Sequence, residues 1–240
     1  MRTLVLLGWL MVPVAFGAYH YGPGQEKLRL DDVGRALRTA DRLAADGDWS
    51  AAIAKYDAAL QQLPEGRLDD ARRIKLLRAK ARMQDRKLPE AYADLSELVD
   101  QLEDDKTADP RLRDDAREAF ANSQYYMTWL MRLEGLPSAE WEPEIDGSRQ
   151  TYRLLAEQAE ARGDRPKAKS LREDLESAIR LARLDLDELQ GLDLPSQCKN
   201  CKSGQCNKPG KKPGKKPGGQ KPPKDARGAS SGPPPDNSGS

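Results

Sequence analysis

Three cysteines, Cys198, Cys201 and Cys206, have the spacing closest to that of a reactive or metal-binding site. The C-x-x-C arrangement of the first two begins many zinc and iron–sulfur sites, and neighbouring lysines favour the reactive thiolate. A closed zinc site needs four ligands, but neither a fourth cysteine nor a histidine lies nearby. The three thiols are therefore weak metal candidates. One disulfide with a thiol left over, or a disulfide between two chains, suits an oxidising compartment.

The rest of the sequence offers little catalytic chemistry. His20 is the single histidine among 240 residues, which excludes His-based triads and HExxH zinc sites. Glu140, Glu142, Glu144 and Asp146 could gather a hard cation, but they lack EF-hand spacing, and acidic residues before a helix commonly complement its dipole. We therefore expect a protein that is not an enzyme and uses no cofactor.

Residues 1–24 have the pattern of an export signal or a membrane anchor. Arg2 precedes an uncharged run from Leu4 to Tyr21. Ala15 and Gly17 suit cleavage before residue 18. At roughly eighteen residues the run also reaches the lower limit for a membrane span, so an uncleaved anchor remains open. Either alternative predicts the cell envelope, with the body of the protein outside the cytoplasm.

The C-terminal part changes composition sharply. From Cys198 to Ser240 there are ten basic and two acidic residues, which leaves a net charge of about −7 on residues 1–197. Residues 193–207 hold the cysteines, and residues 208–240 form a Lys/Pro/Gly-rich tail that we expect to be disordered. Such a tail would attract polyanions or an anionic surface, but it has no aromatic residue for base stacking, so specific nucleic-acid binding is not expected.

The middle of the chain predicts an all-α fold, because apolar residues recur at intervals of three and four. We expect helices over roughly residues 31–46, 49–62, 67–86, 89–104, 110–134, 147–162 and 165–190. The predicted starts are marked by Asp48, Pro89, Asp109, Asp146 or Ser148, and Asp164. The segment around Trp141 is predicted to be a long loop.

One stretch resembles a tetratricopeptide repeat (TPR), a helix-turn-helix unit of 34 residues with small residues where its helices cross. The matching residues are Ala40, Leu43, Gly47, Asp48, Trp49, Ala52, Ile53, Tyr56, Ala59, Leu60 and Pro64. A second copy follows at 39 residues, with Ala79 and Ala91 but with Arg86 in place of the turn glycine. A third, weaker copy contains Tyr152, Gly163 and Ala168.

Residues 25–206 also resemble an uncharacterised bacterial family of exported or membrane-anchored TPR proteins, through Tyr-Tyr-Met-Thr-Trp-Leu-Met-Arg-Leu-Glu-Gly at 125–135 and Arg-Leu-Ala-Arg at 180–183. The resemblance implies a short superhelix of repeats over residues 25–192 and supplies no catalytic residue. In this architecture the first helix of each pair lines the concave side. That arrangement nominates as partner-binding residues Arg38, Arg42, Lys75, Arg78 and Arg82.

The stretch from Tyr125 to Met131 is apolar nearly all the way round, which predicts burial on more than one side. An alternative places Tyr125 and Trp129 in a partner-binding groove. Taken together, the sequence favours a protein–protein interaction scaffold. Two other interpretations stay open: a polyanion binder that acts through its tail, and a cysteine-based redox or metal protein.

Overall fold

The computed structural model describes residues 9, 11, 12, 17 and 23–192. Most of the predicted signal or anchor at 1–24, the cysteine segment 193–207 and the tail 208–240 therefore lie outside the described residues. Within the part of the chain that the structure describes, no helix is both long enough and apolar enough to cross a membrane.

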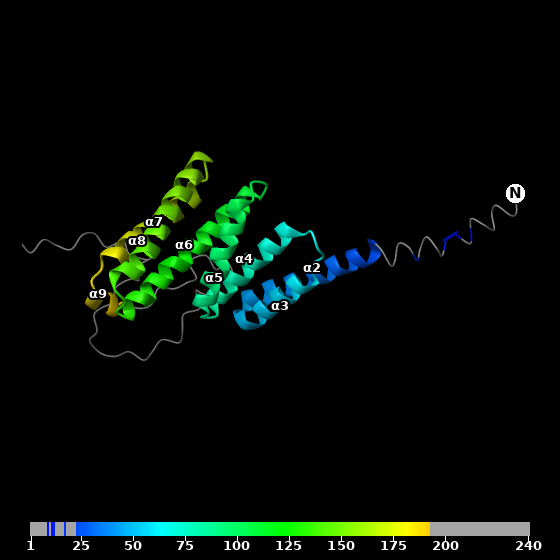
Figure 1. Cartoon of the computed structure of the whole chain (residues 1–240), viewed down its shortest axis with the longest axis horizontal. Coiled ribbons are helices and arrows are strands. Elements are labelled where there is room, and N and C mark those ends of the chain that lie inside the picture. The colour runs from blue at the N-terminus through cyan, green and yellow to red at the C-terminus, as the bar shows by residue number, and fades with distance from the viewer. Residues whose placement is uncertain (1–8, 10, 13–16, 18–22, 193–240) are drawn as a thin grey trace, which may run out of the picture. The chain divides into compact units, whose positions relative to one another are not determined.

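The described chain is all-helical and contains no strand, which confirms the all-α part of the predicted fold (Figure 1). The principal helices are α2 (Pro23–Asp46), α3 (Trp49–Gln62), α4 (Leu68–Gln84), α5 (Leu88–Asp104), α6 (Pro110–Leu133), α7 (Ser138–Ala161), α8 (Arg165–Arg183) and the short α9 (Leu186–Gln190).

Side-chain caps account for three of the predicted helix starts. The carboxylate of Asp48 accepts a hydrogen bond from the backbone N–H of Ala51 at 3.1 Å. Asp164 does the same for Lys167 at 3.1 Å, and Asp109 for Arg111 at 3.0 Å. Each cap satisfies an N–H that has no partner inside its own helix, so these aspartates set where α3, α8 and α6 begin.

Three expected boundaries were wrong. Helix α2 begins at Pro23 instead of residue 31, and the expected helix 165–190 is divided after Arg183. The expected loop around Trp141 is helical, because α7 begins at Ser138 with Glu140 in its first turn. Pro143 lies inside α7, just after its first turn, where its missing N–H removes one helical hydrogen bond. Asp146 and Ser148 therefore lie inside this helix instead of capping it.

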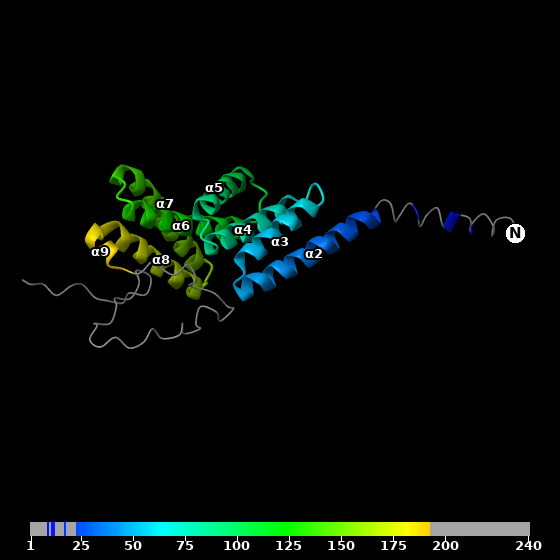
Figure 2. The same ribbon diagram turned by 90° about the horizontal axis from the view of Figure 1, so that it is seen from below.

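The chain divides into two compact units, unit 1 ending at Leu112 and unit 2 beginning at Arg113. In unit 1 each helix packs against the next one along the chain: α2 on α3, α3 on α4 and α4 on α5 (Figure 2). In unit 2, α7 packs along α8, and hydrogen bonds join both of them to α6. The units are described separately below.

Small side chains let the helices of unit 1 approach closely. Ala40, Ala52 and Ala59 are completely buried, as are Ala79 and Ala91. The larger Tyr56 fills the space beside the first three. Its hydroxyl donates a hydrogen bond to Asp41 at 2.9 Å, and burial together with this carboxylate raises the pKa of Tyr56. These five alanines are therefore part of the buried interior of unit 1.

Four helices end in the same type of turn. Gly47, Gly135 and Gly163 adopt positive φ angles of 82°, 75° and 76° after α2, α6 and α7, and Arg86 adopts 63° after α4. In each turn a backbone N–H bonds back to the carbonyl five residues earlier, for example Asp48 to Leu43 at 2.9 Å and Lys87 to Arg82 at 2.9 Å. This hydrogen-bond pattern is the Schellman stop, which favours glycine. Arg86 thus forms the same turn even though it stands in place of the glycine that such a turn favours.

Trp49 and Pro64 flank α3. Trp49 opens the helix and is half-buried against the core of unit 1, whereas Pro64 directly follows the C-cap residue Leu63. Proline cannot continue a helix, so Pro64 suits this position.

Unit 2 is built around aromatic and buried polar side chains. Trp129, Tyr125 and Tyr152 are almost fully buried, and Ala168 is buried on α8. The hydroxyl of Ser148 on α7 donates to the carbonyl of Ala121 on α6 at 2.9 Å. The adjacent Gly147 faces Gln124, because a Cβ at this glycine would lie 2.8 Å from the Gln124 Nε2 atom. Helices α6 and α7 are thus in close contact at this point.

Arg132 joins the end of α6 to the end of α8. Its guanidinium donates hydrogen bonds to the carbonyls of Leu181 and Leu184 and lies 4.7 Å from the ring centroid of Trp141. Burial lowers the pKa of Arg132, and the charge of Asp185 partly opposes this effect. The last carbonyls of α8 thus receive donors from a buried cation, which satisfies groups that have no partner in their own helix.

Candidate functional site

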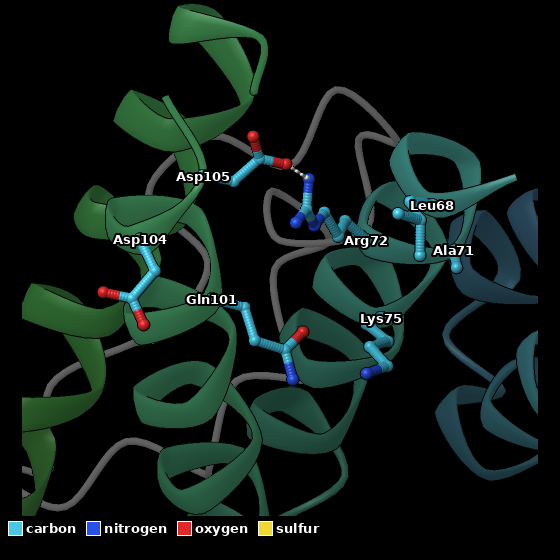
Figure 3. A pocket seen from close by; sticks show the side chains of 7 residues that line it. All are labelled: Leu68, Ala71, Arg72, Lys75, Gln101, Asp104 and Asp105. Carbon is cyan, nitrogen blue, oxygen red and sulfur yellow. Dashed lines mark hydrogen bonds and ion pairs between the residues drawn. The ribbon is translucent and has the colours of Figure 1, made fainter. Parts of the chain in front are cut away.

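An open cleft of about 710 Å³ lies between α4 and α5 in unit 1 (Figure 3). Four of its residues come from the first half of α4, and three come from the end of α5 and the residue after it. The lining residues are Leu68, Ala71, Arg72, Lys75, Gln101, Asp104 and Asp105.

Helical periodicity explains why these residues share one surface. Leu68, Ala71, Arg72 and Lys75 follow one another at i, i+3, i+4 and i+7, so they lie along one face of α4. Gln101, Asp104 and Asp105 have the same i, i+3, i+4 spacing. The start of α4 and the end of α5 therefore present two matched faces to the cleft.

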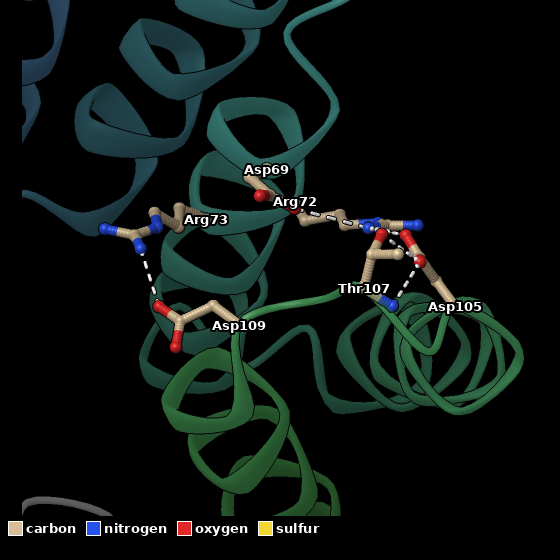
Figure 4. A network of polar contacts seen from close by, with 6 residues as sticks. All are labelled: Asp69, Arg72, Arg73, Asp105, Thr107 and Asp109. Carbon is tan, nitrogen blue, oxygen red and sulfur yellow. Dashed lines mark hydrogen bonds and ion pairs between the residues drawn. The ribbon is translucent and has the colours of Figure 1, made fainter.

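Arg72 closes one side of the cleft through an ion pair. Its Nη1 atom lies 2.7 Å from Asp105 Oδ2 and 3.3 Å from Asp69 Oδ1 (Figure 4). Only 12% of the Arg72 side chain is exposed, and 26% of that of Asp105. Partial burial reduces the screening of this pair by solvent, which makes Arg72 a positioning contact between the two helices.

Thr107 fixes the carboxylate of Asp105. The threonine hydroxyl donates to Asp105 Oδ1 at 2.6 Å, and its backbone N–H donates to the same oxygen at 2.9 Å. The hydroxyl bond, followed by the bonds from Arg72 and the Thr107 backbone, holds the pKa of Asp105 well below its usual range. Asp105 is therefore a charged, oriented acceptor at neutral pH.

A second ion pair joins α4 to Asp109, the residue that precedes α6. Arg73 Nη2 lies 2.7 Å from Asp109 Oδ2, while the other oxygen of Asp109 caps the backbone of Arg111. One carboxylate thus serves both the ion pair and the helix start. The rim of the cleft is held in place by these contacts within unit 1.

Two charged residues of the cleft are available to a ligand. Lys75 is half-buried and Asp104 is exposed, and neither has an ion-pair partner among the described residues. Leu68 adds an apolar side chain that is 64% exposed. The cleft therefore offers one cation, one carboxylate and an apolar contact to a molecule that enters from solvent.

The structure places Arg78 and Arg82 in an internal network. Arg78 lies 2.8 Å from Asp57 on α3 and 3.2 Å from Asp94 on α5, and Arg82 lies 2.5 Å from the same oxygen of Asp94. Their side chains are only 17% and 21% exposed. Both arginines hold α3, α4 and α5 together, and they do not line the cleft as Lys75 does.

Arg38 and Arg42 lie elsewhere on unit 1. Both are exposed on α2, one turn apart, with no ion-pair partner among the residues that the structure describes. They do not belong to the lining of the cleft. The five basic residues nominated from the sequence are therefore not brought together into one site.

Tyr125 and Trp129 are packing residues, which corrects the prediction that they bind a partner. Tyr125 is 0% exposed and Trp129 is 1% exposed. Tyr125 meets Tyr126 edge-on at 5.4 Å and Trp129 at 6.2 Å between ring centroids. The alternative interpretation, burial on more than one side of α6, describes their environment.

No cluster of three or more His, Cys, Asp or Glu side chains suited to a metal ion occurs in the described ranges. Of the acidic run in α7, Glu144 accepts a hydrogen bond from Gln124 and Asp146 forms an ion pair with Arg149 at 2.8 Å. The three cysteines lie outside these ranges, so their chemistry remains a sequence-based prediction.

Sequence reasoning nominated one residue of the cleft and missed the other six. The available signal was charge: α4 contains six basic and two acidic residues, whereas α5 contains six acidic residues and no basic one. Neighbouring helices of opposite charge predict ion pairs between them.

No protein-family model, curated protein or solved structure matches the chain.

Proposed function

We propose that the protein is a non-enzymatic protein–protein interaction scaffold of the bacterial cell envelope, and that the cleft between α4 and α5 holds a segment of its partner. The observation that carries this proposal is the lining of the cleft. Lys75, Asp104 and Leu68 lie on the same open surface. The two charged side chains are not engaged in ion pairs with the described residues, and Leu68 is exposed.

The chemistry of the cleft suits a peptide segment. An apolar side chain of the partner would pack on Leu68 and Ala71, a partner carboxylate would pair with Lys75, and a basic side chain would pair with Asp104. The amide of Gln101 lies between them and can accept or donate a hydrogen bond. Because the opening is wide and polar, binding would depend on several moderate contacts.

The architecture that we propose for residues 25–192 is TPR-like. Completely buried alanines at helix contacts, Tyr56 between helices and a left-handed residue at the turn of each pair support it. A stack of such units presents an extended surface to a partner, which is the usual role of helical repeats. The repeat assignment is therefore part of the proposed function.

The proposed location rests on residues 1–24. A basic start, an apolar run and small residues near its end are typical of a signal peptide or membrane anchor, and either would place unit 1 and unit 2 outside the cytoplasm.

Charge reversal in the cleft tests the proposed binding site. Full-length protein would be cross-linked in its own membranes and purified, and the co-purified proteins would be compared between wild type, Lys75→Glu and the control Lys80→Glu. Lys80 is an exposed lysine of the same helix outside the cleft. We expect Lys75→Glu to reduce recovery of a stoichiometric partner at least tenfold, and Lys80→Glu to leave it unchanged.

Two outcomes would contradict the proposal: equal recovery with all three proteins, or equal loss with both variants. Circular dichroism of each variant confirms that the helices are retained. Because both substitutions are at surface positions of one helix, the comparison isolates the cleft.

A further inference from the structure

Helix α5 carries the most one-sided charge of the described helices. Its seventeen residues include six carboxylates and no lysine or arginine. The neighbouring α4 carries the opposite charge, so its side chains are the first candidates to neutralise α5.

The cations of α4 leave most of this charge uncompensated. Arg78 and Arg82 both pair with Asp94, while Arg72 pairs with Asp105 beyond the end of α5. Four exposed carboxylates have no ion-pair partner among the described residues. These residues, which we call the α5 acidic face, are Glu90, Glu97, Asp100 and Asp104.

The acidic face is regularly spaced. Glu90, Glu97 and Asp104 follow at intervals of seven residues, so they lie on nearly the same side of the helix. With a rise of 1.5 Å per residue, they are separated by about 10.5 Å along its axis. Asp100 lies within one turn of both Glu97 and Asp104, which makes the stripe continuous.

We propose that the α5 acidic face is the docking surface for residues 208–224 of this chain. That segment contains seven lysines and no aspartate or glutamate. Lysines recur every four residues at Lys208, Lys211–Lys212 and Lys215–Lys216. Bound as an extended chain that rises about 3.1 Å per residue, this repeat would advance about 12 Å, which is close to the roughly 10.5 Å between carboxylates seven residues apart.

Charge complementarity identifies the occupant. The segment has no apolar side chain to bury, and the acidic face has no basic side chain to repel lysines. Each exposed ion pair is weak and screened by salt, so docking needs several pairs along the stripe. Asp104 also lines the cleft, whereas Glu90, Glu97 and Asp100 do not, so the tail and a partner segment would compete only at Asp104.

Zero-length cross-linking of the full-length protein tests this docking. A carbodiimide joins a lysine amine to a carboxylate that touches it, and mass spectrometry identifies the joined residues. We expect the lysines of 208–224 to be linked mainly to the α5 acidic face. Raising the salt to roughly 0.5 M, where the screening length is about 4 Å, should reduce these links at least fivefold.

A matched pair of variants isolates the surface. The triple variant Glu97→Gln, Asp100→Asn, Asp104→Asn should lose the links and leave the tail lysines largely unlinked. The control Asp31→Asn, Glu157→Gln, Glu176→Gln removes the same charge from exposed positions on other helices and should keep them. Links within one chain and links between two chains both support the proposal, because the occupant is the same segment.

Three results would overturn the proposal: tail links distributed evenly over exposed carboxylates, no links to α5, or α5 links that persist in the triple variant at a carboxylate outside the acidic face. Circular dichroism checks that both triple variants keep their helices. Loss of partner recovery in Lys75→Glu with no tail links to α5 would refute the docking while leaving the proposed function standing.

Discussion

Unit 1 and unit 2 differ in how deeply their polar side chains are buried. Among the described residues, every buried polar or charged side chain belongs to unit 2. They are Ser123, Gln124, Thr128, Arg132, Ser148, Asp174 and Ser177. Unit 1 keeps its polar contacts partly exposed, as ion pairs of Arg72, Arg78 and Arg82 around a core rich in alanine.

This difference indicates separate roles. A buried hydrogen bond such as that of Ser148 to Ala121 is costly to break, so it holds two helices in one register. In unit 1 the ion pairs of Arg78 and Arg82 hold neighbouring helices together, so the polar groups that a ligand can reach there are the unpaired Lys75 and Asp104 of the cleft. Under the proposed function, unit 2 would be the rigid framework and unit 1 the recognition surface.

The largest effect is expected at Trp129. Replacing this buried side chain by alanine should lower the free energy of unfolding by about 3–5 kcal/mol, because a large cavity is left in unit 2. Trp49→Ala, at the half-buried position in unit 1, should cost less. Chemical denaturation measures both. A Trp129→Ala protein of unchanged stability that loses its partner would restore the discarded binding role.

A smaller effect is expected where α6 and α7 meet. Gly147→Ala places a Cβ 2.8 Å from the Nε2 atom of Gln124, so this buried side chain has to shift away from its hydrogen bond to Glu144, and the change should cost about 1 kcal/mol. The matched change in unit 1, Gly34→Ala in α2, meets only the end of Arg38 at 3.4 Å. It should stabilise α2 by about 0.5–1 kcal/mol through helix propensity. Thermal unfolding would contradict the comparison if both changes acted in the same direction.

The left-handed turn positions of the two units can be compared by opposite substitutions between arginine and glycine. Arg86 of unit 1 and Gly163 of unit 2 both have positive φ, which costs a non-glycine residue about 1 kcal/mol. Arg86→Gly should therefore stabilise the protein by about 0.5–1 kcal/mol, and Gly163→Arg should destabilise it by a similar amount. Urea denaturation of both variants measures this. Equal and opposite shifts are expected, and a destabilised Arg86→Gly variant would show that the arginine side chain contributes a contact.

The smallest effect concerns pH in unit 1. The folded-state pKa of Asp105 is depressed, so its stabilising contribution is present at neutral pH and is lost as the pH falls from about 4 through the folded pKa. Asp105→Asn should lower stability at pH 7, and the difference from wild type should shrink below about pH 4. Denaturation at a series of pH values tests this. A difference that does not change down to pH 2 would exclude the ionised carboxylate as its cause.

Local chemistry made much of the fold predictable. Asp48, Asp109 and Asp164 cap helices where the sequence places them, and Gly47 and Gly163 end the preceding helices as expected. These signals act within a few residues, so one sequence is enough to interpret them.

Tertiary contacts explain what could not be predicted. The helix beginning at Ser138 contains Pro143, which lowers its local helix preference, and its packing against α6 outweighs that cost. Arg78 and Arg82 looked available because their partners, Asp57 and Asp94, lie 12 or more residues away in the sequence. The cleft needed both helices in place before its lining could be recognised.

The division of roles between the units is tested most directly by photo-cross-linking in living cells. A photoreactive amino acid would replace Leu68 at the cleft of unit 1 or, as a matched control, Leu154 of unit 2, which is also an exposed leucine at 42%. We predict a discrete adduct to one partner protein from position 68 and none from position 154. An adduct from position 154 alone would contradict the account and move recognition to unit 2.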